Sequence, residues 1–182
     1  MSTEASLGKI DDAGRPQHRL VVVRWLLLVG WALTAIGYYG PWIAQPTAAL
    51  TLSGVDMGEF VKFLPGVLDG SLSALRQLFY LPPFAVVVSV ALLVGSRRLR
   101  FSWAVRAPAL LLAVPVSLQL LPPAWSPSSL STPEFRLQTA ALGLCWLLLA
   151  GFWLLGRLPP WLVGSLSALL SMMAMVMPAW QF

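Results

Sequence analysis

Five apolar runs of about 20 residues divide this sequence, and each is long enough to cross a lipid bilayer as a helix. A bilayer core of about 30 Å requires about 20 helical residues at about 1.5 Å per residue. The runs are bounded by charged, proline or tryptophan residues and cover residues 22–42, 75–95, 103–121, 137–155 and 161–180. The sequence therefore predicts an all-α fold: a polytopic integral membrane protein, built as a bundle of about five transmembrane helices.

The composition excludes two other classes of protein. Hydrophobic residues make up 58% of the chain and charged residues 10%, whereas a soluble domain averages about half apolar and a quarter charged. A disordered chain needs the opposite balance. The net charge of +5 does not indicate nucleic acid, because the basic residues lie between the apolar runs rather than on one polar face. We expect the lipid bilayer as a partner, and no nucleic acid.

The distribution of Lys and Arg predicts the orientation in the membrane. Residues 1–19 are polar and are expected to form a loose cytoplasmic tail, and residues 20–182 a single transmembrane domain. Basic residues are retained on the cytoplasmic side, and they gather in the tail and after the second run. The topology-determining residues of that second group are Arg97, Arg98, Arg100 and Arg106. The N-terminus is thus expected in the cytoplasm, with the loop 43–74 and the C-terminus external, in a plasma (inner) membrane.

A cleaved signal peptide is the alternative interpretation of the first run. Ala35 and Gly37 fit a small-x-small cleavage site loosely. The apolar run continues past Gly37 to Trp42, however, so we expect an uncleaved first span.

The loop 43–74 contains the pattern of a short amphipathic helix. Ser53 and Asp56 have the spacing of a capping box, and Pro65 with Gly66 is expected to end the helix. The apolar residues at helical spacing, which we expect to make an interaction surface, are Met57, Phe60, Val61 and Leu64. About ten residues are too few for a stable isolated helix, so it requires support from the membrane surface, from this chain's own helices or from a partner. Residues 47–53 are expected to be extended.

Prolines modify the predicted spans. Pro82 and Pro83 predict a shorter helix over residues 71–80 that meets the second span at a bend. Pro115 lies in the middle of the third span, where the carbonyl group that it leaves unbonded needs a hydroxyl, water or a neighbouring helix.

The chemistry of an enzyme is missing from the sequence. There is no ionisable residue near the middle of any run, and no serine-hydrolase, P-loop or dinucleotide fingerprint. Cys145 and His18 cannot form a zinc site. Four methionines in the last run, Met172, Met173, Met175 and Met177, suit Cu(I), but methionine also fills gaps between apolar groups. We expect no enzyme activity, no cofactor and no metal.

Small residues predict faces for helix packing, because helices in lipid associate through close backbone approach. The candidate packing residues are Gly30, Thr34 and Gly37 in the first run and Gly164, Ala168 and Ser171 in the fifth. They contact either each other or another subunit. Gln119, Gln138 and Thr139 line a small cavity or simply cap and join helices.

Together these features favour an accessory or scaffold subunit of a larger membrane complex, without catalytic activity and with other membrane subunits as partners. The alternative is a small-solute binding component of a membrane transporter, with the loop 43–74 as its lid.

Overall fold

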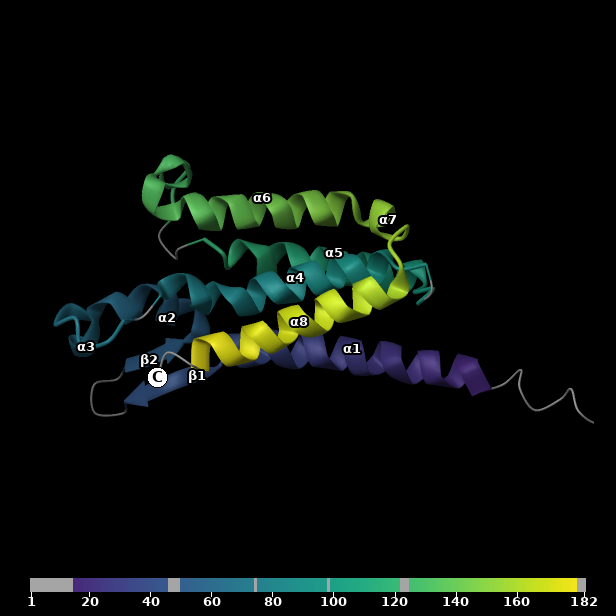
Figure 1. The fold of residues 1–182 in the computed structure, drawn as a ribbon, viewed down its shortest axis with the longest axis horizontal. Helices are drawn as coiled ribbons and strands as arrows, with labels where there is room; N and C mark the ends of the chain where they lie inside the picture. The colour runs from purple at the N-terminus through teal and green to yellow at the C-terminus, as the bar shows by residue number, and fades with distance from the viewer. Residues whose placement is uncertain (1–14, 46–49, 74, 98, 122–124, 180–182) are drawn as a thin grey trace, which may run out of the picture. The chain divides into compact units, whose positions relative to one another are not determined.

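The computed structural model is all-α, with 78% of it helical (Figure 1). It describes residues 15–45, 50–73, 75–97, 99–121 and 125–179. The chain divides into two compact units, Met1–Leu33 and Thr34–Phe182.

Each of the five apolar runs contains a helix. The helices are α1 (Arg15–Tyr39), α4 (Leu81–Gly95), α5 (Trp103–Leu118), α6 (Arg136–Ala150) with the short α7 (Phe152–Leu155), and α8 (Pro160–Ala179). Among the described residues, Arg76–Gly95 and Pro160–Met177 are long and apolar enough to cross a membrane, and α5 is apolar but shorter. This gives limited support for membrane association. The count of five spans stays a prediction.

Helix α1 differs at both ends from the predicted span 22–42. It begins at Arg15, so the last part of the expected tail 1–19 is helical, and it ends at Tyr39. Strand β1 (Pro41–Gln45) follows and pairs antiparallel with β2 (Leu50–Ser53), which adds a hairpin to the helical fold. The register shifts between Pro41 and Ile43, as expected where proline has no N–H to donate. The extended segment expected before Ser53 is confirmed over β2.

Helix α4 is the centre of the second unit. It contacts α5, α6, α7 and α8, and Figure 1 shows it running between α6 and α8. Within Arg76–Gly95, 83% of the most apolar window is buried, against 17% within Pro160–Met177. Gly95 permits close contact with α7, because a Cβ atom there would collide with the backbone carbonyl of Phe152. Helix α4 is therefore the core helix, and α8 lies at the periphery.

The prolines are accommodated within the helices. Pro82 and Pro83 lie at the start of α4, where a missing N–H has no effect on helical bonding. The helix predicted over residues 71–80 is shorter, a 3-10 helix η3 (Arg76–Tyr80) that leads directly into α4. Pro115 lies inside α5, which continues through it to Leu118.

The segment between α1 and η3 folds into a small structure of its own, which we call the loop cap: β1, β2, α2 (Gly54–Phe60), η2 (Val61–Phe63) and α3 (Pro65–Leu68). The capping box is confirmed, because the Ser53 N–H and hydroxyl both donate to Asp56 Oδ2, at 3.0 and 2.7 Å. Helices α2 and η2 together cover the ten residues predicted. The helical stretch ends at Phe63, just before Pro65 as predicted, and Pro65 then begins a further helical turn, α3.

The connection from α3 to η3 is organised by Asp69. Its Oδ1 atom accepts the backbone N–H of Ser71 at 2.9 Å. The hydroxyl and backbone N–H of Ser71 lower the pKa of this exposed carboxyl. The negative charge of Asp69 is thereby favoured in the turn.

Candidate functional site

The apolar face of the amphipathic helix packs against the chain's own residues. Met57 and Val61 are each 1% exposed and form a core cluster with Leu52 of β2 and Phe79 of η3. The partly buried side chains packed against this cluster are Phe60, Leu64 and Val67. The sequence left three possible supports for this helix: the membrane surface, the chain's own helices or a partner. The structure shows the second, because η3 supports it. The surface predicted for interaction is thus largely used to hold the loop cap on η3.

Gly58 fixes how closely α2 approaches η3. A Cβ atom at this position would lie 2.8 Å from Cζ of Tyr80, inside van der Waals contact. The tyrosine ring therefore occupies the space beside the glycine. This packing leaves the Tyr80 hydroxyl within 3.0 Å of Glu59 Oε1, to which it donates a hydrogen bond.

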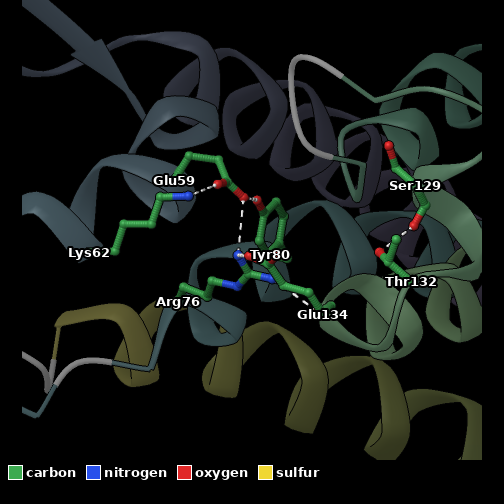
Figure 2. A network of polar contacts seen from close by, with 7 residues as sticks. All are labelled: Glu59, Lys62, Arg76, Tyr80, Ser129, Thr132 and Glu134. Atoms are coloured by element: carbon green, nitrogen blue, oxygen red, sulfur yellow. Dashed lines mark hydrogen bonds and ion pairs between the residues drawn. The ribbon is translucent and has the colours of Figure 1, made fainter.

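A network of charged side chains joins the loop cap to the segment before α6 (Figure 2). Arg76 lies between two carboxylates: its Nη1 is 2.6 Å from Glu134 Oε1 and 3.7 Å from Glu59 Oε1. Its Nη2 also donates to the backbone carbonyl of Glu134 at 3.0 Å, and its guanidinium lies 5.0 Å from the ring centroid of Phe135. Lys62 completes the network through Glu59 Oε2 at 2.9 Å. Arg76 is thus the link between α2, η3 and η5 (Pro133–Phe135).

Ser129 and Thr132 shape the turn that carries Glu134. The Thr132 hydroxyl donates to the Ser129 carbonyl at 2.7 Å, as Figure 2 shows. This bond follows the 3-10 helix η4 (Ser129–Ser131) and precedes η5. It holds the chain in the turn that brings Glu134 to Arg76.

A cavity of about 200 Å³ lies beside this network. It is lined by Gln77, Tyr80, Leu81, Phe84, Leu120, Leu137, Gln138 and Ala141, from η3, α4, the residues after α5, and α6. Most of these side chains are apolar. The lining residues that the structure describes do not include any from 43–74, so the predicted lid is not part of the wall.

The three polar residues proposed from sequence as a cavity lining have different environments. Thr139 donates to the Leu130 carbonyl at 3.1 Å, and Gln119 Nε2 donates to the Pro115 carbonyl at 3.5 Å, so both join local backbone. Gln138 alone of the three lines the cavity. It is 3% exposed, and neither its amide nitrogen nor its amide oxygen has a hydrogen-bond partner among the described residues.

Helices α5 and α6 share a partly buried polar contact near Pro115. Trp146 Nε1 donates to the Ser117 hydroxyl at 3.0 Å, and that hydroxyl donates to the Val114 carbonyl at 2.6 Å. The Ser117 hydroxyl thus bonds Val114 and not the carbonyl of Leu111, which Pro115 leaves without its helical N–H, so the partner expected for that carbonyl stays a prediction.

The small residues predicted to pack in the fifth run lie on the outer side of α8. Gly164, Ala168 and Ser171 are exposed, and a Cβ atom at Gly164 would meet no atom within 4 Å. The side chains of α8 that are buried within this chain are Val163, Ser167 and Ala174. Within the second unit, α8 therefore packs through a neighbouring face, and contact of the predicted residues with the first run or with another subunit stays a prediction.

The remaining predicted residues lie at the ends of the second unit or at the junction of the two units. Gly30 belongs to the first unit and Thr34 and Gly37 to the second, so no packing between units is assigned to them. Arg97 and Arg100 are exposed after α4, and Arg98 lies outside the described residues. The fourth topology-determining residue, Arg106, is half-buried in α5.

The described residues contain no group of three His, Cys, Asp or Glu side chains placed to hold a metal ion. Comparison of the chain with protein-family models, with characterised proteins and with solved structures finds no match. The site is therefore defined by its own geometry: a charged network and, next to it, an apolar cavity with one unpaired amide.

Proposed function

We propose that this chain is an integral membrane protein without catalytic activity, acting as an accessory or scaffold subunit of a larger membrane complex. Large apolar side chains on the outside of the second unit support a location in lipid. They include Leu111 and Leu112 of α5, Leu144 and Leu147 of α6, and Leu169, Met172 and Met175 of α8. A soluble monomer rarely exposes a large contiguous apolar surface, whereas lipid covers one without cost.

The outer side of α8 is the observation that carries the subunit role. Gly164, Ala168 and Ser171 follow one another there at helical spacing, and the space beside Gly164 is open. In lipid, small side chains allow two helix backbones to approach closely, and large ones favour contact with acyl chains. We therefore propose that a transmembrane helix of a second membrane subunit occupies this face.

The proposed orientation places the N-terminus in the cytoplasm and the C-terminus outside a plasma (inner) membrane, in a multi-pass topology. The two ends of α4 support it, because exposed Arg97 and Arg100 follow one end and the balanced network of Arg76 with two carboxylates lies at the other. Cysteine labelling in intact cells tests this orientation, with Cys145→Ala as the background. An impermeant reagent should label Ser129→Cys and not Arg97→Cys, and the reverse result contradicts it.

Substitution of Ala168 tests the subunit contact. Ala168→Leu adds bulk to an exposed position, so the isolated chain should keep its thermal stability within about 0.5 kcal/mol. In the assembly the leucine should hold the second helix away, and companion subunits should be lost on purification in mild detergent. Leu169→Met is the control, because Leu169 is also exposed on α8 but lies about 100° around the helix from Ala168, and the exchange conserves volume.

The subunit role is contradicted if the wild-type protein purifies without companions from mild detergent. The assigned face is contradicted if companions remain bound to Ala168→Leu as well as to Leu169→Met. A fall in the stability of the isolated variant would show that α8 uses this face inside the chain.

A further inference from the structure

We propose that the cavity between η3, α4 and α6 is a binding site for a small, mainly apolar molecule with one hydroxyl or carboxamide group, which pairs with the side-chain amide of Gln138. This site is separate from the helix contact proposed on α8. None of its lining residues belongs to α8.

Gln138 is the polar feature of this site. Its side chain is 3% exposed, it lines the cavity, and both amide atoms are without a partner among the described residues. Buried polar side chains in folded proteins are nearly always hydrogen-bonded, because an unpaired buried group carries the full cost of its desolvation. In the described part of the chain, Ser89, Arg106 and Ser167 also have an unpaired buried side-chain atom, but Gln138 is the residue of this group that lines the cavity, and both of its amide atoms are unpaired. We therefore infer that its partner comes from outside the chain.

The other polar groups in the cavity wall are either hydrogen-bonded within the chain or less buried than Gln138. The Tyr80 hydroxyl donates to Glu59 and so presents its ring, rather than a free donor, to the cavity. Gln77 is half-buried on η3. Leu81, Phe84 and Leu120 supply apolar surface. A charged ligand would lose its hydration here without a counter-charge in the wall, so a neutral molecule fits better.

The volume limits the size of the ligand. A cavity of about 150 Å³ with apolar walls holds a benzene ring. The present cavity, at about 200 Å³, has room inside for one ring with a short substituent, and it is partly open, since Leu137 in its wall is exposed. An amide offers one acceptor and two donor hydrogens, so a hydroxyl or a carboxamide can both donate to Gln138 and accept from it. A hydrocarbon of the same shape can do neither.

Binding of benzyl alcohol and of ethylbenzene, which have nearly the same shape, tests this proposal. Each is added to the full chain in the same detergent, and its dissociation constant is obtained from the rise in melting temperature with ligand concentration. Relative to Gln138→Leu, we expect the wild type to favour benzyl alcohol over ethylbenzene about tenfold more, as one hydrogen bond to a buried amide predicts. Partition into detergent is the same for all variants of the protein and therefore cancels between them.

Three variants separate the cavity from nonspecific effects. Gln138→Leu should remove the preference for the alcohol and should melt no lower than the wild type without ligand, because it replaces an unpaired polar group by an apolar one of similar volume. Ala141→Phe should fill the cavity and abolish the response to both compounds. Ala140→Phe is the control, since Ala140 is exposed on the same helix, and it should respond as the wild type does.

Several results would overturn the proposal. The proposal is wrong if the wild type responds to neither compound, or if the ratio of its two dissociation constants equals that of Gln138→Leu. Retention of the preference by Gln138→Leu would place recognition elsewhere, and a lower melting temperature for that variant without ligand would show that the amide is already paired within the protein. If Ala141→Phe does not fold, the comparison of Gln138→Leu with the wild type still decides the outcome.

Discussion

Removal of the Arg76 guanidinium should loosen the attachment of the loop cap to the end of the helices. In Arg76→Gln, the hydrogen bond to the Glu134 backbone, worth about 1 kcal/mol, is lost. The contact with the Phe135 ring adds about 0.5–1 kcal/mol. The ion pair with Glu134 adds at most about 1 kcal/mol, because that carboxylate is 57% exposed and screened by solvent. The sum is about 2 kcal/mol.

Two further variants separate the contributions to the loss of stability expected for Arg76→Gln. Glu134→Gln removes only the charge of the exposed partner and leaves its backbone carbonyl in place, so it should destabilise by less than about 1 kcal/mol. Arg136→Gln removes a neighbouring positive charge from an exposed side chain and should stay within about 0.5 kcal/mol of the wild type. We expect Arg136→Gln to be the most stable of the three variants, followed by Glu134→Gln, with Arg76→Gln the least stable.

Thermal unfolding in mild detergent measures these differences. For a chain of this length, about 2 kcal/mol corresponds to a fall in melting temperature of about 4–8 °C. Added salt should reduce the effect of Glu134→Gln more than that of Arg76→Gln, because only the exposed ion pair is strongly screened. If Arg76→Gln melts at the same temperature as Arg136→Gln, the network does not hold the loop cap, and the reasoning is wrong.

Four other substitutions test packing and capping by the same melting experiment. Gly58→Ala should destabilise by about 1–3 kcal/mol, since its methyl group would overlap the Tyr80 ring, whereas Gly143→Ala, with no atom within 4 Å of the new carbon, should stabilise by about 0.5–1 kcal/mol. Equal effects would contradict the close approach of α2 to η3. Ser53→Ala should cost about 1 kcal/mol through loss of the capping box, and no change would mean that the helix start is held by other bonds. Trp146→Phe should cost about 1 kcal/mol by removing the hydrogen bond between α5 and α6, and an unchanged melting temperature would show that this bond adds nothing.

Local patterns in the sequence predicted the local structure well. The capping box at Ser53 and the apolar spacing of Met57 and Val61 depend on residues three or four positions apart, and the structure confirms the helix that they predict. The helix in each apolar run follows from its length and composition. The hairpin was only partly expected, through the extended segment 47–53, and the start of α1 at Arg15 was missed. Strand pairing and helix boundaries depend on tertiary contacts as well as on propensity.

The candidate site depended on contacts that sequence spacing does not reveal. Arg76 and Glu134 are 58 positions apart, and nothing in their own neighbourhoods indicates that they meet. Gln138 was suggested only as one of several polar residues near a helix end. Its unpaired amide became apparent from burial, and burial depends on how Tyr80, Leu120 and α6 come together. A polar residue in the first turn of an apolar helix was the available signal, and it does not distinguish a cap from a cavity wall.

Helix α8 shows why an apolar sequence does not determine which face of a helix packs inside the chain. Along α8, Gly164, Ala168 and Ser171 lie next to Val163 and Ser167, about 100° away around the helix. Both faces are rich in small residues, so hydrophobic pattern alone cannot distinguish them. The structure places Val163 and Ser167 inside the chain and leaves the other face exposed. A helix with small residues on two adjacent faces suits close contact with two neighbours, and one of these neighbours is already present as α4. The second is the helix that we propose from another subunit.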